Sequence, residues 1–226
     1  MKEKITLIVF TLLAICTLNV KAQESSWSAG LDIYNTYVWR GTKYGNGPSF
    51  QPGVKFTTGG FTLGAWGAYS ASNSSHFIEE GAEVDAYREA DLYASYALSL
   101  GEKSTLTFAV TDYFFPGGSS MYFDGDSHYF EPMLTLGLGN FGLSAAYMTN
   151  VEDTYVEAGY TAGAVTLFAG AGDGQYTVDQ EFNFCNVGIK TIKEIKVSET
   201  FSLPVSGSVI LNPSTEQFHI VVGFSL

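Results

Sequence analysis

The chain ends in the stretch QFHIVVGFSL, residues 217–226. Apolar side chains stand at every second position, namely Phe218, Ile220, Val222, Phe224 and Leu226. Side chains alternate across a β-strand, so this spacing predicts a strand with one apolar face and a second face that is small or polar apart from Val221. Outer-membrane barrels cross the bilayer on tilted strands of about this length. We therefore interpret the five apolar residues as a membrane insertion signal that the barrel assembly machinery reads.

The amino terminus has the features of a secretory signal peptide. Lys2 and Lys4 precede an apolar run over residues 5–18, and Ala22 ends a small-residue pattern suited to cleavage. Residues 1–22 are thus predicted to be removed. Beyond them no uninterrupted apolar run reaches the roughly 18 residues that a spanning helix needs. These features favour export to the outer membrane of a Gram-negative bacterium.

Residues 23–226 have the length expected of one large β-domain. Three of the eleven basic residues and one of the twenty-three acidic residues precede residue 23, which leaves eight against twenty-two and a net charge of about −14. Such a charge excludes nucleic acid as a partner, because duplex binding depends on Lys and Arg. Cys185 alone remains after cleavage, so no intramolecular disulfide is expected. Cys16 leaves lipidation as an alternative to cleavage, although bulky Ile15 stands where a lipidation box needs a small residue.

Short alternating segments recur along the whole of this region, and none has a sustained helical period. They predict twelve strands, at residues 27–40, 49–58, 61–71, 88–99, 104–115, 127–138, 141–149, 154–162, 164–171, 182–196, 201–211 and 217–226. The connections alternate between short turns rich in Gly or Asn and longer, more acidic loops. This is the pattern of short periplasmic turns and longer outer loops in membrane barrels. We predict a single all-β domain over 23–226, a transmembrane antiparallel up-and-down β-barrel of about twelve strands.

In each predicted strand one face is apolar and the other is small or polar. Residues such as Leu63, Leu92, Phe108 and Leu143 share one parity, and Gly, Ser and Thr fill the other. Alternation by itself does not say which face is outside, because a soluble barrel packs its apolar face inward. The signal peptide and the final strand favour an apolar face toward lipid. Outer-membrane lipid is therefore a predicted partner.

The same parity assigns a face to three further residues. Tyr37 shares the outward parity of Leu31 and Ile33. Cys185 is most simply a small apolar residue on the outward face. Trp66 falls on an inward face, where we expect it to fill lumen volume.

Charged residues collect on the inward parity. Glu89, Asp91, Glu131 and Glu157 fall in the outer half of their strands with Arg40 at a similar height, and Asp32, Lys55 and Lys190 fall deeper. As pore-lining residues they would favour cations or neutral solutes. The alternative is a self-neutralised network that closes the lumen. Twelve strands lie between the eight that side chains fill and the sixteen that leave a channel, so both interpretations stay open.

Catalysis finds little support in the sequence. Ser127 and His128 are adjacent and point to opposite faces of a strand, and His219 has no serine or acid tied to it by spacing. We predict no catalytic residues and no cofactor. A lipid-acting enzyme remains a minor alternative. Asp124, Asp126 and His128 could hold a metal ion, but a solvated turn explains them more simply, and we predict no metal site.

One segment resembles a known family. The run Tyr37-Val38-Trp39-Arg40-Gly41, with Pro48, Gln51, Gly60 and Gly64-Ala65-Trp66, resembles the TorF-family porins, Gcw_chp-type bacterial outer-membrane proteins of unknown function. The family motif has an acidic or serine residue before the tyrosine, where this chain has Thr36. The resemblance implies a membrane barrel with channel activity and assigns no solute. It also makes Arg40 the first residue to mutate.

These observations together predict an outer-membrane, porin-like channel for passive diffusion of small solutes, with a mild cation or neutral-solute preference. The alternative is a non-conducting structural or surface-interaction barrel, with loops 72–87 and 116–126 as contact surfaces. The oligomeric state and the solute are not determined by the sequence.

Overall fold

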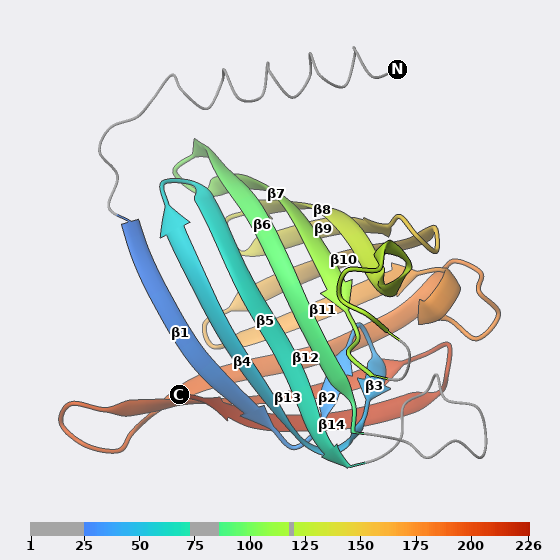
Figure 1. Cartoon of the computed structure of the whole chain (residues 1–226). Coiled ribbons are helices and arrows are strands. Elements are labelled where there is room, and N and C mark those ends of the chain that lie inside the picture. Colours follow the sequence, from blue (N-terminus) through green and yellow to red (C-terminus); the bar gives the residue numbers. More distant parts are fainter. Residues whose placement is uncertain (1–24, 73–85, 118–119) are drawn as a thin grey trace.

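The computed structural model describes residues 25–72, 86–117 and 120–226, and the predicted signal peptide lies outside these ranges. Twelve strands form a closed antiparallel barrel, in which each strand bonds to the next along the chain and β14 bonds to β1 (Figure 1). The barrel strands are β1 (Ser25–Tyr34), β4 (Asn46–Thr58), β5 (Phe61–Ser72), β6 (Arg88–Gly101), β7 (Ser104–Phe114), β8 (His128–Leu138), β9 (Phe141–Met148), β10 (Asp153–Ala162), β11 (Val165–Gly172), β12 (Asn183–Lys196), β13 (Ser202–Asn212) and β14 (Gln217–Ser225). The predicted all-β up-and-down barrel of twelve strands is confirmed.

The two faces of the barrel wall are as the alternation predicted. Leu63, Phe108 and Leu143 are about half exposed on the outside, whereas the inward positions carry small, polar or buried groups. In β14, Phe218 and Ile220 are outside and exposed, and the alternate residue Val221 is buried. The wall is therefore apolar outside and polar inside, the reverse of a soluble barrel. No helix in the described ranges is both long and apolar enough to span a membrane.

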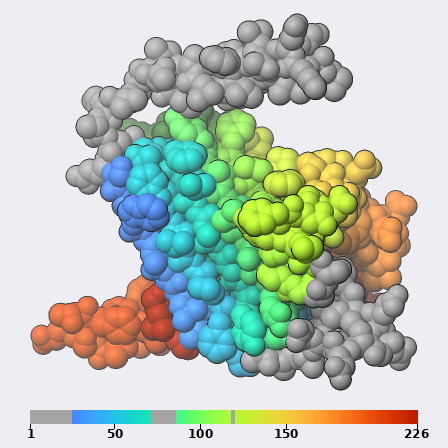
Figure 2. All heavy atoms as spheres, in the orientation of Figure 1, coloured from blue at the N-terminus to red at the C-terminus, as the bar shows by residue number. Residues whose placement is uncertain are grey.

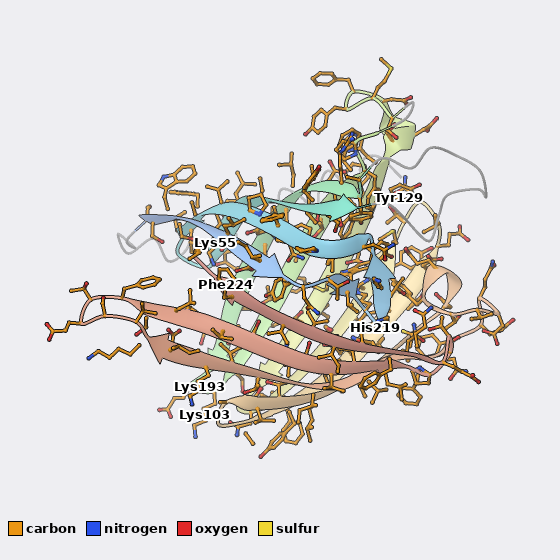
Figure 3. All side chains as sticks on the ribbon, turned by 90° about the horizontal axis from the view of Figure 1, so that it is seen from below. Lys55, Lys103, Tyr129, Lys193, His219 and Phe224 are labelled. Atoms are coloured by element: carbon orange, nitrogen blue, oxygen red, sulfur yellow. The ribbon has the colours of Figure 1, made fainter. Side chains whose placement is uncertain are left out.

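The two ends of the barrel differ in their connections. Tight turns at residues 59–60, 102–103, 139–140 and 163–164 lie at one end, called here the turn end, and all but the turn at 102–103 contain the Gly or Asn that favours such turns. The opposite end, called the loop end, carries the longer connections and two 3-10 turns, η1 (Gly125–Ser127) and η2 (Gly174–Tyr176). In Figure 3, Tyr129 lies toward the loop end, and Lys103 and Lys193 lie toward the turn end. Both described termini belong to the turn end (Figure 1).

The seam between β1 and β14 is short. Three residue pairs join these strands, from Asp32 with Ser225 to Tyr34 with Gly223, whereas β1 and β4 pair along ten residues. Leu226 extends the seam, because its amide donates to the Leu31 carbonyl and its carbonyl accepts from the Leu31 amide. The last residue of the chain is thus part of barrel closure. The turn between β12 and β13 continues past this seam and projects from the body of the molecule (Figure 2).

The first predicted strand, 27–40, is wrong in its second half. β1 ends at Tyr34, and residues beyond it form a separate hairpin of β2 (Tyr37–Trp39) and β3 (Thr42–Tyr44). Asn35 causes the departure, because its side chain accepts from the Val222 amide and donates to the Ile220 carbonyl. The Val222 amide thus bonds to the Asn35 side chain, while the Asn35 amide still donates to the Val222 carbonyl at 2.9 Å, and beyond this rung the chain turns away from the wall. Tyr37, predicted to face outward with Leu31, is buried inside the barrel.

Candidate functional site

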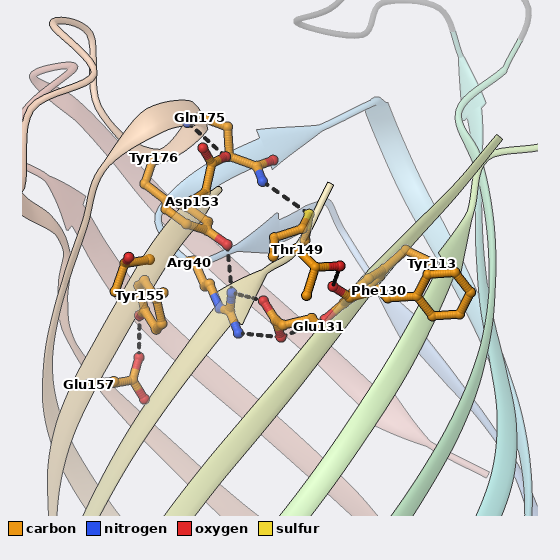
Figure 4. A network of polar contacts seen from close by, with 12 residues as sticks. Arg40, Tyr113, Phe130, Glu131, Thr149, Asp153, Tyr155, Glu157, Gln175 and Tyr176 are labelled. Atoms are coloured by element: carbon orange, nitrogen blue, oxygen red, sulfur yellow. Dashed lines mark hydrogen bonds and ion pairs between the residues drawn. The ribbon is translucent and has the colours of Figure 1, made fainter. Parts of the chain in front are cut away.

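The inner hairpin, residues 37–44, turns back at Arg40 and Gly41. Both residues have positive φ angles, 49° and 81°. This is the conformation that a two-residue type I′ turn requires at both central positions, because it matches the twist of the flanking strands. Glycine adopts it freely, but a non-glycine residue there is uncommon. The strained conformation holds the Arg40 side chain at the tip of the hairpin, where it projects into the lumen (Figure 4).

The Arg40 guanidinium binds Glu131 on β8. Nη1 donates to Oε2 at 2.5 Å and Nη2 donates to Oε1 at 2.9 Å. Nη1 also donates to the Tyr176 hydroxyl at 2.6 Å, and the Tyr113 hydroxyl donates to Glu131 Oε1 at 3.1 Å. The Arg40 and Glu131 side chains are 10% and 2% exposed. A bidentate, buried ion pair of this kind fixes orientation as well as distance. The hairpin tip is therefore tied to the barrel wall at β8.

Aromatic rings surround the same guanidinium. Its Cζ lies 4.4 Å from the ring centroid of Trp39, 4.3 Å from Tyr155 and 5.5 Å from Tyr176. Cation–π attraction is strongest where water is excluded, as it is here. Burial by itself lowers the pKa of Arg40, but the hydrogen bond and charge of Glu131 outweigh burial, so the pKa lies above the ordinary arginine value. The side chain is a permanent cation within this cage.

The faces of the hairpin pack against other parts of the wall. The Tyr37 ring lies 5.7 Å from Trp66 on β5 and 5.8 Å from Tyr87 before β6. The Trp39 ring lies 5.7 Å from Tyr113 on β7. Trp66 was predicted to fill lumen volume, and it does so against the hairpin. The inner hairpin and these rings occupy the lumen near the loop end.

The turn of the hairpin meets the far side of the barrel. The Gly41 carbonyl accepts from Nδ2 of Asn212 at 3.3 Å, and a Cβ at Gly41 would overlap the backbone oxygen of Cys185. Cys185 was predicted to be a small outward residue, and this was wrong. A register shift between Gly170 and Ala171 leaves Cys185 as an extra residue of β12, and it is fully buried. The hairpin thus spans the lumen from its root beside β1 and β4 to β8, β12 and β13.

The other predicted lumen acids lie around the hairpin. Glu89 and Asp91 on β6 are 7% and 6% exposed, and the Tyr87 hydroxyl donates to Glu89 at 2.7 Å. Glu157 on β10 accepts from the Tyr155 hydroxyl at 2.7 Å and from Asn186 at 2.9 Å. These acids and Arg40 therefore lie near the loop end, as predicted. Their role in lining a pore stays a prediction.

Lys55 and Lys190 lie apart from this network, toward the turn end, whereas Asp32 lies two residues before the end of β1, where the chain leads into the inner hairpin. Asp32 lies opposite Gln51, and Lys55 lies opposite Ser28, where β1 and β4 pair. Lys190 lies beside Thr166 and Ser208, with Nζ 5.9 Å from the Phe168 ring. Both lysines are exposed. The predicted pore-lining residues thus form two groups. Arg40 and the four acids lie together around the hairpin, whereas Asp32, Lys55 and Lys190 are separate charges with small, polar neighbours on the adjacent strands.

The loop residues weighed as metal ligands have other contacts. Nδ1 of His128 lies 2.8 Å from Asp112, and its Nε2 lies 2.6 Å from the Tyr122 carbonyl. Asp124 caps η1 by accepting from the Asp126 amide at 3.2 Å. Among the described residues no group of three acids, cysteines or histidines is placed to hold a metal ion. The Asp112–His128 contact lies on the outer parity of the wall and explains how an acid is accommodated there.

A family model described as bacterial protein of unknown function (Gcw_chp) matches residues 21–192, which is most of the chain and includes the inner hairpin. The chain belongs to this family. No curated protein matches the chain. Membership in the Gcw_chp family assigns no activity to the barrel. The site in this Gcw_chp barrel must be interpreted from its own geometry.

Sequence reasoning placed Arg40 at the height of the acids but missed the hairpin around it. The residue pair Arg40-Gly41 was a signal for a tight turn, since glycine favours positive φ. This signal was concealed because Tyr37 and Trp39 continue the parity of Leu31 and Ile33. A strand that stays in the wall and a segment that turns inward have the same spacing of apolar residues. Tyr155 and Tyr176, which complete the cage, carry no local signal for that role.

Proposed function

We propose that this protein is an outer-membrane barrel that forms a channel for small solutes, and that the inner hairpin holds the channel closed in the state described. The Arg40–Glu131 ion pair carries this proposal, because it ties the hairpin tip to the wall across the lumen. The hairpin is not a strand of the wall, and side-chain contacts hold its tip and faces, so it can be released without unpairing the barrel strands. The residues 37–44 would then act as the gate.

Insertion in the outer membrane is supported by the wall itself. Large apolar side chains cover its outer face, and every strand of the barrel is paired, so backbone groups are bonded between strands as lipid requires. The loop end would face the outside and the turn end the periplasm, in keeping with long outer loops and short inner turns. The resemblance of residues 37–41 and 64–66 to TorF-family porins supports the same topology and channel activity.

Solute preference follows from the charges. Glu89, Asp91, Glu131 and Glu157 face the lumen beside one ion-paired arginine, so an opened lumen would carry excess negative charge near the loop end. Carboxylate rings favour cations over anions. We therefore propose a preference for cations and neutral solutes. The runner-up function is a permanently closed structural barrel, favoured by the contacts of the hairpin with several parts of the wall.

Single-channel recording in planar bilayers tests the gate. The wild-type barrel should be closed for most of the time, and Arg40→Ala should raise its open probability about tenfold or more. Replacement of residues 37–44 by a short Gly-Ser linker should give steady conductance. Lys43→Ala is the matched control, because it removes one positive charge from the same hairpin without touching the ion pair.

Four outcomes would count against the proposal. If the barrel conducts no ions even after the hairpin is replaced, the structural function would be established instead. Equal steady conductance of wild type and hairpin replacement would show that the hairpin does not gate. A reversal potential indicating anion preference would contradict the proposed role of the acids. Recovery of the protein from the soluble periplasm would exclude the membrane barrel altogether.

A further inference from the structure

The acids near the hairpin are not balanced by the cation between them. Glu131 is paired with Arg40, whereas the described hydrogen bonds of Glu89 and Glu157 come from neutral tyrosine and asparagine groups. Asp91 is different again. It is 6% exposed, and its Oδ1 is buried with no hydrogen-bond partner in the described part of the chain. A buried carboxylate oxygen without a donor is costly, and each such group in a native fold calls for a specific explanation.

The neighbours of Asp91 are aromatic. Along the sheet Asp91 lies directly opposite Trp66 on β5 and Tyr113 on β7. Directly opposed residues of antiparallel strands share a face, with their Cβ atoms about 5 Å apart. Trp66 in turn contacts Tyr37 of the hairpin. The free carboxylate oxygen is thus flanked by aromatic groups on both sides.

Arg40 shows what such a set of groups binds. Its guanidinium is held by one carboxylate, one tyrosine hydroxyl and three aromatic rings. Asp91 with Trp66 and Tyr113 offers the same chemistry, a carboxylate acceptor between aromatic faces, but the chain supplies no cation to it within the described ranges. Glu89, two residues away on the same face of β6, adds a second negative charge. Among the described residues, Glu89 and Asp91 on this side of the hairpin therefore have no ion pair of their own.

An inorganic ion suits these groups less well than an organic cation. Calcium and magnesium take six or more oxygen ligands, and no group of three acidic or histidine ligands is assembled among the described residues. An amine or a guanidine needs only a carboxylate acceptor for its N–H groups and aromatic faces for its charge. The chemistry of the site thus selects a ligand of the same class as the Arg40 side chain.

We propose that Asp91, supported by Glu89, Trp66 and Tyr113, is a binding site for a small organic cation that carries an amine or a guanidine. The inference rests on the proposed function and deepens it, because it names the class of solute that enters the lumen. The site lies next to Tyr37, so an occupant would share its aromatic wall with the hairpin. Arg40 would remain the cation of the neighbouring cage.

Calorimetric titration of the full-length folded barrel in detergent tests the site, with agmatine as the probe. Agmatine should bind saturably, and butyramide, which has no charge, should not. Asp91→Asn, which keeps the shape of the side chain, should weaken agmatine binding at least tenfold. Asp126→Asn is the matched control, since it removes one carboxylate from the exposed loop and should leave the dissociation constant unchanged.

A second variant separates binding from folding. Trp66→Leu should weaken agmatine binding severalfold. A difference in gel mobility between unheated and heated samples verifies that the variant barrel is folded. The site would be overturned if wild type gave no saturable heat of binding, or if wild type and Asp91→Asn bound agmatine with equal affinity. Asp91 would then be a buried carboxyl group that is kept neutral by a proton. Displacement of agmatine by equimolar calcium would point to a metal site instead and also overturn it.

The two proposals fail separately. Agmatine binding to a barrel that never conducts would overturn the channel function but keep the site. Conductance without agmatine binding, by contrast, would keep the channel and remove the site.

Discussion

Gly41 in the hairpin turn lies against the backbone oxygen of Cys185 on β12, so close that no side chain can stand between them. The two residues are 144 positions apart in the sequence. A register shift in β12 moves Cys185 inward, and a left-handed turn brings Gly41 to it. The contact fixes the depth at which the hairpin lies in the lumen.

Gly41→Ala should therefore displace the hairpin. The new methyl group overlaps Cys185, and the φ of 81° at this position is unfavourable for alanine, which together should lower the free energy of unfolding by about 1–3 kcal/mol. Urea unfolding and channel recording measure the two effects. Gly142→Ala is the control, because a Cβ at that position would meet nothing within 4 Å. Unchanged stability and unchanged channel closure in Gly41→Ala would refute the contact.

The Arg40–Glu131 pair should be energetically coupled. Loss of either partner leaves a buried charge, so Arg40→Ala and Glu131→Ala should each destabilise the barrel by about 3–5 kcal/mol. The double variant should lose less than the sum, by about 1–3 kcal/mol. Urea unfolding of the four proteins measures the coupling. Additive losses would mean that the two side chains do not interact in solution.

Arg40→Lys should keep only part of the interaction with Glu131. Lysine keeps the charge but not the planar fork that bonds both carboxylate oxygens. Its channel-open probability should fall between those of wild type and Arg40→Ala. A lysine variant identical to wild type would show that charge alone closes the gate.

Asn35 should be important for barrel closure. Its side chain bonds the backbone of β14 at Ile220 and Val222, at 3.0 and 2.8 Å, on the shortest seam of the barrel. Asn35→Ala should cost about 1–3 kcal/mol and lower the yield of folded barrel. Gel mobility before and after heating measures that yield. Ser225→Ala changes a side chain at the same seam and serves as control, and equal yields for both variants would contradict the role of Asn35.

The inner tyrosines should titrate late. Burial raises the pKa of Tyr44 and of Tyr176 above the ordinary tyrosine value near 10. Because the folded-state pKa is the higher one, the stabilisation from the protonated hydroxyls is complete below about pH 10 and is lost as the pH rises through the folded-state pKa. Tyrosinate absorbance of the folded barrel should lag behind that of the urea-unfolded chain. Superimposable titration curves would contradict burial of the hairpin.

Much of the fold was predictable from local pattern. Eleven of the twelve predicted strands agree with the observed barrel strands to within a few residues, because each records its inside and outside faces in its own alternation. The tight turns at 59–60 and 139–140 were equally legible, since glycine supplies the positive φ that they need. The height of the four acids followed from counting along those strands.

The hairpin and its contacts could not be predicted in this way. Alternation fixes which residues share a face, but it does not say whether a segment stays in the wall. Asn35 decides that by bonding β14, a strand 185 residues away. The pairing of Arg40 with Glu131, the burial of Cys185 and the unpartnered oxygen of Asp91 likewise depend on contacts between distant strands. The sequence by itself determined a twelve-stranded wall with its two faces, because alternation is local. Only the tertiary structure decided that the lumen is occupied, because barrel closure brings the distant strands together.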